Sequence, residues 1–169
     1  MTFSLNKIRS ESGFSIIEMV AVIFVINFAL VGIVSLAIQS IQIERFNKSI
    51  LVAAQLAQEG VELIRNQRDN NWIVPSPGWP PANDNYAVDV DINAVGGIAS
   101  IADDRTKLYT DAEGFYTHDS TGSSTIYRRL VTVNTDPSLA TTTIKSQVQF
   151  SDGFKVKNYI VETELYDWR

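Results

Sequence analysis

An apolar run of 25 residues near the N-terminus constrains this chain more than any other feature of its sequence. The run extends from Phe14 to Ile38, reads FSIIEMVAVIFVINFALVGIVSLAI, and has Glu18 as its only charged residue. As a helix it would be roughly 38 Å long, and the hydrocarbon core of a bilayer is about 30 Å thick. The run therefore predicts a transmembrane helix.

Other interpretations of the run remain open at this point. A secretory signal peptide would have a shorter apolar segment, of about 7–15 residues, although Ser35-Leu36-Ala37 offers small residues where a signal peptidase could cut. The run could also be a plain anchor for an external domain, or the core helix of a soluble protein. Glu18 is the residue that decides among these alternatives.

Residues 1–13 form a short, slightly basic leader ahead of the run. They include Lys7, Arg9 and Glu11. The positive-inside tendency places such a leader in the cytoplasm and the C-terminal part of the chain outside it. Two basic residues follow the run and reduce this bias, so the orientation rests on a small difference in charge.

Glu18 is an unusual residue for its position. Inserting a carboxylate into an apolar span costs about 3 kcal/mol of free energy even on the insertion scales with the lowest values. We therefore expect Glu18 to have a partner and a function. The alternative is that Glu18 lies close enough to the interface for its carboxylate to reach water. Gly13 and Phe14 bear on this choice, because they directly precede the run.

The residues Gly13-Phe14-Ser15-Ile16-Ile17-Glu18-Met19 resemble the processing motif of the type IV prepilin family, which includes the type II secretion pseudopilins. The resemblance implies that prepilin peptidase cleaves between Gly13 and Phe14 and then N-methylates the new amine of Phe14. It also implies that the Glu18 carboxylate meets the N-terminal amine of a neighbouring subunit during filament assembly. A carboxylate and a cationic amine relieve each other's desolvation in a low dielectric, which agrees with that role.

A second, less specific similarity extends along the helix. Phe28–Ser35 followed by Ala54–Glu62 is similar to minor pilins and minor pseudopilins. Two features depart from the family: Ser35 stands where many pilins have a proline, and the chain has no cysteine for the disulfide that closes a C-terminal loop in many pilins.

Helical periodicity continues beyond the apolar run. Apolar and small residues recur at spacings of three and four as far as Ile64, and no proline interrupts residues 14–71, which predicts one helix over that range. The centre of the stripe is small, with Ala53, Ala57 and Gly60. Because glycine inside a helix costs about 1 kcal/mol relative to alanine, Gly60 predicts the close approach of a packed sheet.

The remaining chain has the pattern of an antiparallel sheet. Residues 72–84 contain four prolines and a glycine, which predicts a connecting loop. Alternation around Val88, Val90 and Ile92 predicts a strand, with Asp89 and Asp91 on the face toward water. No structure is assigned to residues 94–125. Three antiparallel strands are predicted at the end of the chain: Ile126–Asn134, Thr142–Phe150 and Phe154–Leu165.

The turn between the last two strands determines their register. A three-residue turn over Ser151-Asp152-Gly153 would place Phe150 opposite Phe154, Val148 opposite Val156 and Ile144 opposite Ile160. A two-residue Asp-Gly turn would place apolar residues opposite lysines. The sequence therefore favours the three-residue turn.

These elements predict an α+β, pilin-like fold, in which a C-terminal antiparallel sheet packs on the second half of one long N-terminal helix. The segments expected are a cytoplasmic leader (1–13), a transmembrane half-helix (14–38), an amphipathic half-helix (39–71) and an exported β-rich domain (72–169).

Residues that could carry catalysis or bind a ligand are sparse. The net charge of −5 and the acidic C-terminal part argue against nucleic-acid binding, and the absence of cysteine excludes thiolate chemistry. His118, the only histidine, is expected in a loop rather than in a zinc site or a catalytic dyad. Aspartates could offer oxygens to calcium, but without the spacing of a calcium loop; they are Asp84, Asp89, Asp91, Asp103 and Asp104. No catalytic residue, metal or cofactor is predicted.

The function expected from the resemblance is that of a non-enzymatic structural subunit, of the minor kind, in a type IV pilus or a type II secretion pseudopilus. Its partners would be prepilin peptidase, other pilin or pseudopilin subunits and the inner-membrane assembly machinery. It would lie in the inner membrane as a single-pass protein and then in a surface or periplasmic filament. The alternative is a membrane-tethered extracytoplasmic binding domain that does not polymerise.

Overall fold

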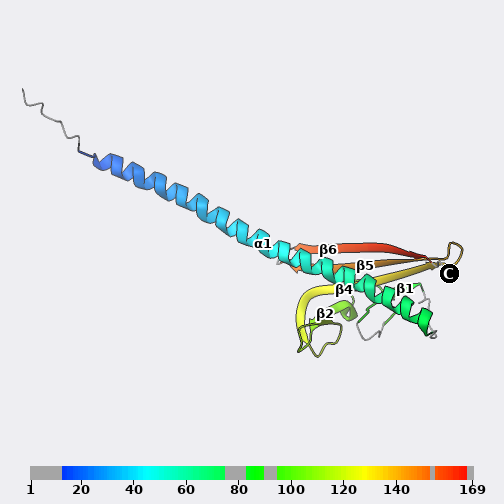
Figure 1. Ribbon diagram of the computed structural model, residues 1–169. Coiled ribbons are helices and arrows are strands. Elements are labelled where there is room, and N and C mark those ends of the chain that lie inside the picture. The colour runs from blue at the N-terminus through cyan, green and yellow to red at the C-terminus, as the bar shows by residue number, and fades with distance from the viewer. Residues whose placement is uncertain (1–12, 75–82, 90–94, 153–154, 167–169) are drawn as a thin grey trace, which may run out of the picture. The chain divides into compact units, whose positions relative to one another are not determined.

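The computed structural model describes residues 13–74, 83–89, 95–152 and 155–166 (Figure 1). Its elements are α1 (Ile16–Ile73), β1 (Asp84–Tyr86), the short 3-10 helix η1 (Asp104–Thr106), β2 (Lys107–Thr110), β3 (Tyr116–Thr117), β4 (Ser123–Asp136), β5 (Thr141–Asp152) and β6 (Lys155–Tyr166). The fold is α+β, with one long N-terminal helix and a C-terminal antiparallel sheet that packs on it, as predicted.

The chain divides into two units, Met1–Glu44 and Arg45–Arg169. They are called here the N-terminal unit and the C-terminal unit. The N-terminal unit holds the first part of α1, and the C-terminal unit holds the rest of α1 together with every strand. Helix α1 has 58 residues and begins and ends two residues later than the predicted helix over 14–71.

The sheet of the C-terminal unit has the order β3-β2-β4-β5-β6, and β1 pairs with β4 beside β2. All described pairings are antiparallel. The long strands β4 and β5 cover and extend the predicted strands Ile126–Asn134 and Thr142–Phe150. Strand β6 begins and ends one residue later than the predicted strand Phe154–Leu165. Strands β2 and β3 supply the structure that the sequence left unassigned between residues 94 and 125.

The buried face of α1 matches the predicted stripe of small residues. Ala53, Ala57 and Gly60 are buried, together with Leu56, Val61 and Ile64. A Cβ atom built on Gly60 would meet side chains of both β4 and β5, including Val131 Cγ2 at 3.1 Å. The prediction that Gly60 permits close approach of a sheet is confirmed.

The core of the C-terminal unit contains two apolar clusters between α1 and the sheet. The first is formed by Val61, Ile64, Tyr86, Val88, Val131, Val133, Ile144 and Leu165. The second is formed by Ala53, Leu56, Ala57, Leu108, Tyr127, Val148 and Phe150. Along α1, β4 and β5 the residues between the clusters are Gly60, Arg129 and Ser146, whereas Val161 of β6 packs against both clusters. We call these three residues the polar layer.

The predicted register of the last hairpin is wrong. Asp152 pairs with Lys155, and Phe150 therefore lies opposite Lys157, Val148 opposite Tyr159 and Ile144 opposite Thr163. The turn residue Gly153 and the predicted partner Phe154 lie outside the described residues.

The reason for the difference is the charge on β6. The predicted register would have turned Val156 and Ile160 toward the core, but Glu162 and Glu164 share their face. In the observed register Leu165 is buried and Tyr159 and Val161 pack against the apolar clusters. Val156 and Ile160 are exposed. Burying Glu162 and Glu164 would cost more free energy than burying Val156 and Ile160 would gain.

The strand predicted around Val88, Val90 and Ile92 also needs correction. Pairing with β4 occurs earlier, at Asp84–Tyr86, and Val90 to Ile92 lie outside the described residues. Asp89 does not face water: its carboxylate is largely buried, with 21 % of the side chain exposed. The alternation correctly predicts that Val88 is in the core, whereas Asp89 binds partners inside the domain instead of water.

Candidate functional site

Gly13 and Phe14 lie ahead of the first turn of α1. Both residues are exposed and neither belongs to a helix or strand. No atom lies within 4 Å of a Cβ built on Gly13, and 76 % of the Phe14 side chain is exposed. A protease needs an accessible, non-helical bond, and the Gly13–Phe14 bond meets that requirement in the described residues.

Ser15 directly precedes α1. Its carbonyl oxygen accepts hydrogen bonds from the backbone N–H groups of Glu18 at 3.0 Å and Met19 at 3.2 Å. This places the Glu18 carboxylate in the first turn, where the positive end of the helix dipole stabilises a negative charge. The first turn of α1 therefore carries the negative charge of Glu18, and it comes shortly after the Gly13–Phe14 bond at which cleavage is expected.

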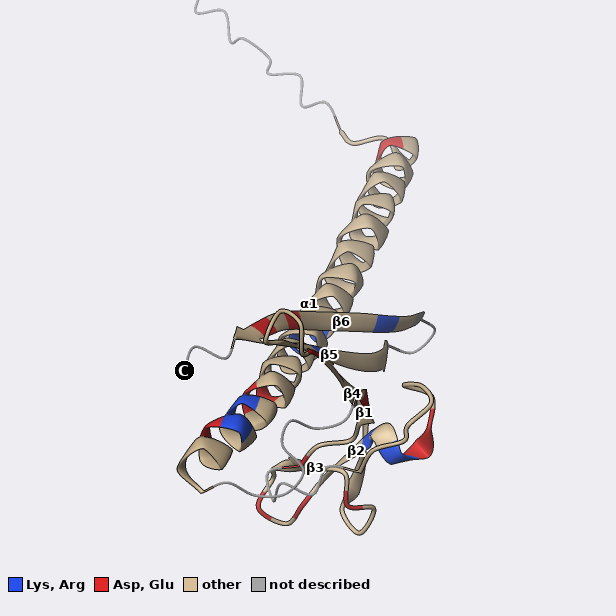
Figure 2. Cartoon of the chain, turned by 90° about the vertical axis from the view of Figure 1, so that its right-hand side faces the viewer, with Lys and Arg blue, Asp and Glu red and all other residues tan. Residues whose placement is uncertain are grey.

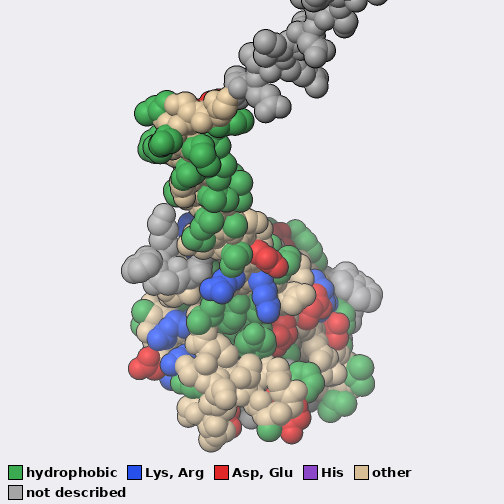
Figure 3. All heavy atoms as spheres, turned by 90° about the vertical axis from the view of Figure 1, so that its left-hand side faces the viewer, with side chains coloured by type: hydrophobic (Ala, Val, Ile, Leu, Met, Phe, Trp, Pro, Cys, Tyr) green, Lys and Arg blue, Asp and Glu red, His purple; other side chains and the backbone are tan. Residues whose placement is uncertain are grey.

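The first part of α1 presents an almost wholly apolar surface to its surroundings. Every residue from Gly13 to Arg45 is exposed, and the large apolar side chains between Phe14 and Ile38 expose 48–83 % of their surface. In the space-filling view hydrophobic side chains cover this part of the helix (Figure 3). Figure 2 shows the contrast in charge, because acidic and basic residues are concentrated in the second part of α1. Surface of this kind needs an apolar environment.

Two polar residues inside this surface have hydrogen-bond partners within the helix. Asn27 Nδ2 donates to the Ile23 carbonyl at 2.8 Å, and Ser35 Oγ donates to the Val31 carbonyl at 2.9 Å. Such bonds to the preceding turn lower the cost of placing an amide or a hydroxyl in hydrocarbon. The helix as a whole is long and apolar enough to cross a membrane.

Glu18 differs from Asn27 and Ser35 because its side chain has no hydrogen bond within the described residues. The sequence contains no lysine or arginine between Phe14 and Glu44, so this part of the helix offers the carboxylate no counter-charge. Within the described residues the charge of Glu18 is therefore not neutralised by a neighbouring side chain, and it could be neutralised by a cationic group of another molecule.

A cluster of carboxylate and carbonyl groups surrounds Arg129 of β4, whose side chain is fully buried in the C-terminal unit. Its Nη1 lies 3.0 Å from Glu59 Oε1 and donates to the Leu56 carbonyl at 3.4 Å. Its Nη2 donates to the Val88 carbonyl at 2.7 Å and lies 3.9 Å from Asp89 Oδ1. The guanidinium therefore joins α1 to the segment that follows β1.

Sequence reasoning missed Arg129, although a signal was present. Every second residue over this part of β4 faces the core, namely Tyr127, Arg129, Val131 and Val133. The period of two in a strand predicts that Arg129 points the same way as its apolar neighbours, whereas Arg128 points to the other face.

Asp89 and His118 extend the network around Arg129. Asp89 Oδ2 accepts hydrogen bonds from Thr117 Oγ1 and from the His118 backbone N–H, both at 2.8 Å. His118 follows β3 in a loop, as predicted, but it is half-buried: its Nδ1 lies 3.2 Å from the Lys107 carbonyl oxygen. Burial, and secondarily the positive charge of Arg129, keep the pKa of His118 below its ordinary value.

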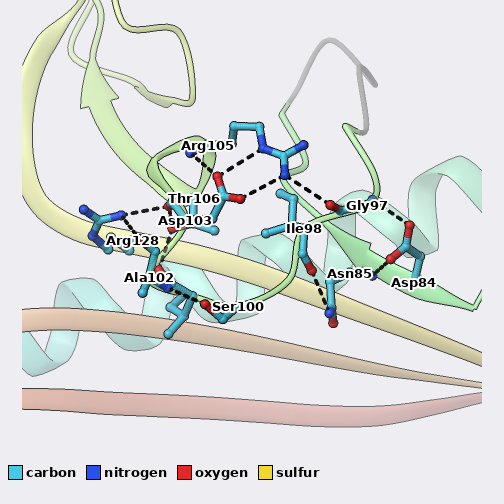
Figure 4. A network of polar contacts seen from close by, with 11 residues as sticks. Asp84, Asn85, Gly97, Ile98, Ser100, Ala102, Asp103, Arg105, Thr106 and Arg128 are labelled. Carbon is cyan, nitrogen blue, oxygen red and sulfur yellow. Dashed lines mark hydrogen bonds and ion pairs between the residues drawn. The ribbon is translucent and has the colours of Figure 1, made fainter.

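The remaining aspartates considered as calcium ligands serve protein donors instead (Figure 4). Asp84 accepts from the backbone N–H of Gly97 at 2.6 Å, and Asp103 accepts from Nε and Nη2 of Arg105 at 3.0 and 2.9 Å. The hydrogen bonds from Arg105 hold the pKa of Asp103 at about 2. Asp91 lies outside the described residues, and among those described no three acidic or histidine side chains gather as a metal site.

Comparisons with protein-family models, with curated proteins and with solved structures found no match to this chain. The functional proposal therefore rests on the residues and their geometry, together with the resemblance of the segment around Gly13 and Glu18.

Proposed function

We propose that the chain is a non-enzymatic structural subunit, of the minor kind, of a type IV pilus or a type II secretion pseudopilus. Prepilin peptidase cleaves it between Gly13 and Phe14 and methylates the Phe14 amine. Before assembly it is a single-pass protein of the inner membrane, with residues 1–13 in the cytoplasm and the C-terminal unit outside. The assembly machinery of the inner membrane then transfers it into a filament of pilin or pseudopilin subunits.

The observation that carries the proposal is the position of Glu18. It is the only charge on an exposed apolar helix surface, it lies in the first turn, and the cleavable bond precedes that turn. Cleavage creates a positively charged amine at Phe14. The amine of one subunit and the carboxylate of the next can neutralise each other in the low dielectric of a helix bundle, where either alone is costly.

The alternative function is a membrane-tethered binding domain that does not polymerise. Such a domain uses the same apolar helix. It gives no reason for a glycine-phenylalanine bond exposed before the helix, or for an acidic residue four positions further along. The proposal accounts for both features with one chemical step and one ion pair.

The test is the intact mass and N-terminal sequence of the protein purified from membranes of cells with and without prepilin peptidase. The proposal expects a chain that begins at N-methylated Phe14 only when the peptidase is present. A Gly13→Val variant should keep the leader, because a branched side chain would block the cleavage bond, whereas a Gly32→Val variant is the matched control that should be cut normally. An uncut wild-type chain, or one cut near Ala37, would refute the proposal.

A further inference from the structure

Strand β3 is held to the C-terminal unit by few backbone contacts. It has two residues, and only two residue pairs join it to β2: Tyr109 with Thr117 and Thr110 with Tyr116. It lies at the edge of the sheet order. A strand this short does not hold itself in place, so side chains must contribute much of its attachment.

Asp89 supplies that attachment. It accepts from the hydroxyl of Thr117 and the backbone N–H of His118, so one carboxylate oxygen ties two consecutive residues at the end of β3. The other oxygen faces the buried guanidinium of Arg129, which is itself bound to α1 through Glu59. The attachment of β3 is therefore a chain of contacts that ends on the helix.

His118 is the member of this group that can change charge near neutral pH. Its Nε2 is shielded from solvent and has no hydrogen-bond partner among the described residues, while Nδ1 faces the Lys107 carbonyl of β2. The carbonyl of Arg105 in η1 also faces the ring. Among the described residues, the charged groups around it are Asp89 after β1 and Arg129 of β4, with Glu59 of α1 behind Arg129.

Protonation would place an imidazolium in a site that already contains a buried guanidinium. Of the two facing charges, Asp89 favours the cation, but it is shared with Arg129, and burial disfavours any added charge. The pKa of His118 is accordingly lowered, with burial as the largest cause and Arg129 as the next. The folded form therefore prefers neutral His118.

We propose that Asp89, Thr117, His118 and Arg129 form an acid-sensitive latch, in which protonation of His118 releases β3 from the C-terminal unit. The latch is independent of the proposed filament function and would operate equally in a tethered domain. Its stabilising effect is complete above about pH 6.5, the ordinary pKa of histidine, and is lost as the pH falls through the lower pKa of the folded form.

Release would uncover specific surface. The ring of Tyr116 in β3 packs edge-on against Tyr127 with ring centres 5.9 Å apart, and Tyr116 also borders the second apolar cluster. Opening of β3 therefore exposes the Tyr127 ring and frees the edge of β2. In the latched state both are covered.

The experiment is hydrogen exchange of the full chain in detergent micelles, with protection factors corrected for the intrinsic effect of pH. Between pH 7.5 and 5.5 we expect protection of the Thr117 and His118 amides to fall by about tenfold, since pH 5.5 is about one unit below the pKa of free histidine. The amides of Val133 and Ile144, in the β4–β5 ladder, serve as the internal control and should keep their protection.

A His118→Asn variant tests the mechanism directly. The asparagine amide can donate to the Lys107 carbonyl in place of Nδ1 but does not titrate, so the fall in protection at residue 117 should disappear. Because His118 is the only histidine, its imidazole titration can be followed by NMR in an untagged chain even if the variant does not fold. A wild-type imidazole that titrates at its ordinary pKa, or unchanged protection of Thr117 at pH 5.5, would overturn the latch.

Discussion

A Cβ atom on Gly60 would lie 2.5 Å from Oγ of Ser146. The Gly60→Ala variant sets two effects against each other: alanine favours the helix by about 1 kcal/mol, and overpacking of a core costs about 1–3 kcal/mol. Since the new methyl would also press on Val131 and Arg129 at 3.1 and 3.2 Å, we expect overpacking to dominate. Denaturant unfolding of the full chain in detergent should show a lower midpoint.

Two variants control this prediction. Gly32→Ala adds the same methyl group where no atom lies within 4 Å, so it should cause no loss of stability. Ser146→Ala removes the closest atom and leaves a smaller residue; combined with Gly60→Ala it should recover part of the lost stability. If Gly60→Ala alone raised the midpoint, the close approach of helix and sheet would be wrong.

Replacing Arg129 with methionine should be strongly destabilising. The variant leaves the carboxylates of Glu59 and Asp89 without their buried partner, and breaking a buried ion pair in this way costs about 3–5 kcal/mol. Because 37 % of the Glu59 side chain is exposed and can be solvated, we expect a loss at the lower end of that range. The neighbouring Arg128→Met is the matched control, because Arg128 faces the other side of the sheet and its ion pair with exposed Asp104 is worth about 0–1 kcal/mol. Equal effects of the two variants in thermal unfolding would contradict a special role for Arg129.

The register of β6 can be tested with two adjacent alanine substitutions. Tyr159 packs against the second apolar cluster, whereas Ile160 is 49 % exposed on the opposite face. We expect Tyr159→Ala to lower the free energy of unfolding by about 1–2 kcal/mol more than Ile160→Ala. The reverse order would favour the three-residue turn after all.

The loop that contains Asp103 should resist acid. Its pKa of about 2 is below the ordinary value of an aspartate, so the contribution of the Asp103–Arg105 contacts is present above about pH 4 and is lost as the pH falls toward 2. NMR titration should show the Arg105 backbone amide shifting with this low midpoint, because that amide donates to Asp103 Oδ1 at 3.0 Å. In Asp103→Asn this shift of the Arg105 amide should vanish.

Glu18→Ala should reduce the amount of the protein in purified filaments by at least about tenfold, which corresponds to about 1.4 kcal/mol of lost assembly free energy. Glu44→Ala, which removes an exposed carboxylate from the end of the N-terminal unit, should assemble normally. Normal incorporation of Glu18→Ala, at equal membrane levels, would remove the assembly role from Glu18.

The helix and its packing face could be predicted because the helical period of 3.6 residues and the small size of Gly60 can both be recognised within one continuous segment of the sequence. The register of β6 could not, because this strand has apolar residues on both faces and only the positions of Glu162 and Glu164 separate the two choices. The buried partners of Asp89 are distant in sequence, so an aspartate in an alternating pattern looked solvated. For the candidate site, Gly13, Phe14 and Glu18 lie where the helix start makes their roles possible, and those roles stay predictions.

The polar layer of Gly60, Arg129 and Ser146 has a consequence for how this domain can vary. On α1, β4 and β5 it separates the two apolar clusters, whereas Val161 of β6 packs against both of them. Val161 is therefore the position at which a change of side-chain volume in one cluster can be passed on to the other. Substitutions that leave Val161 in place can repack one end of the domain with little effect on the other end, so the two ends can vary in sequence partly independently of each other.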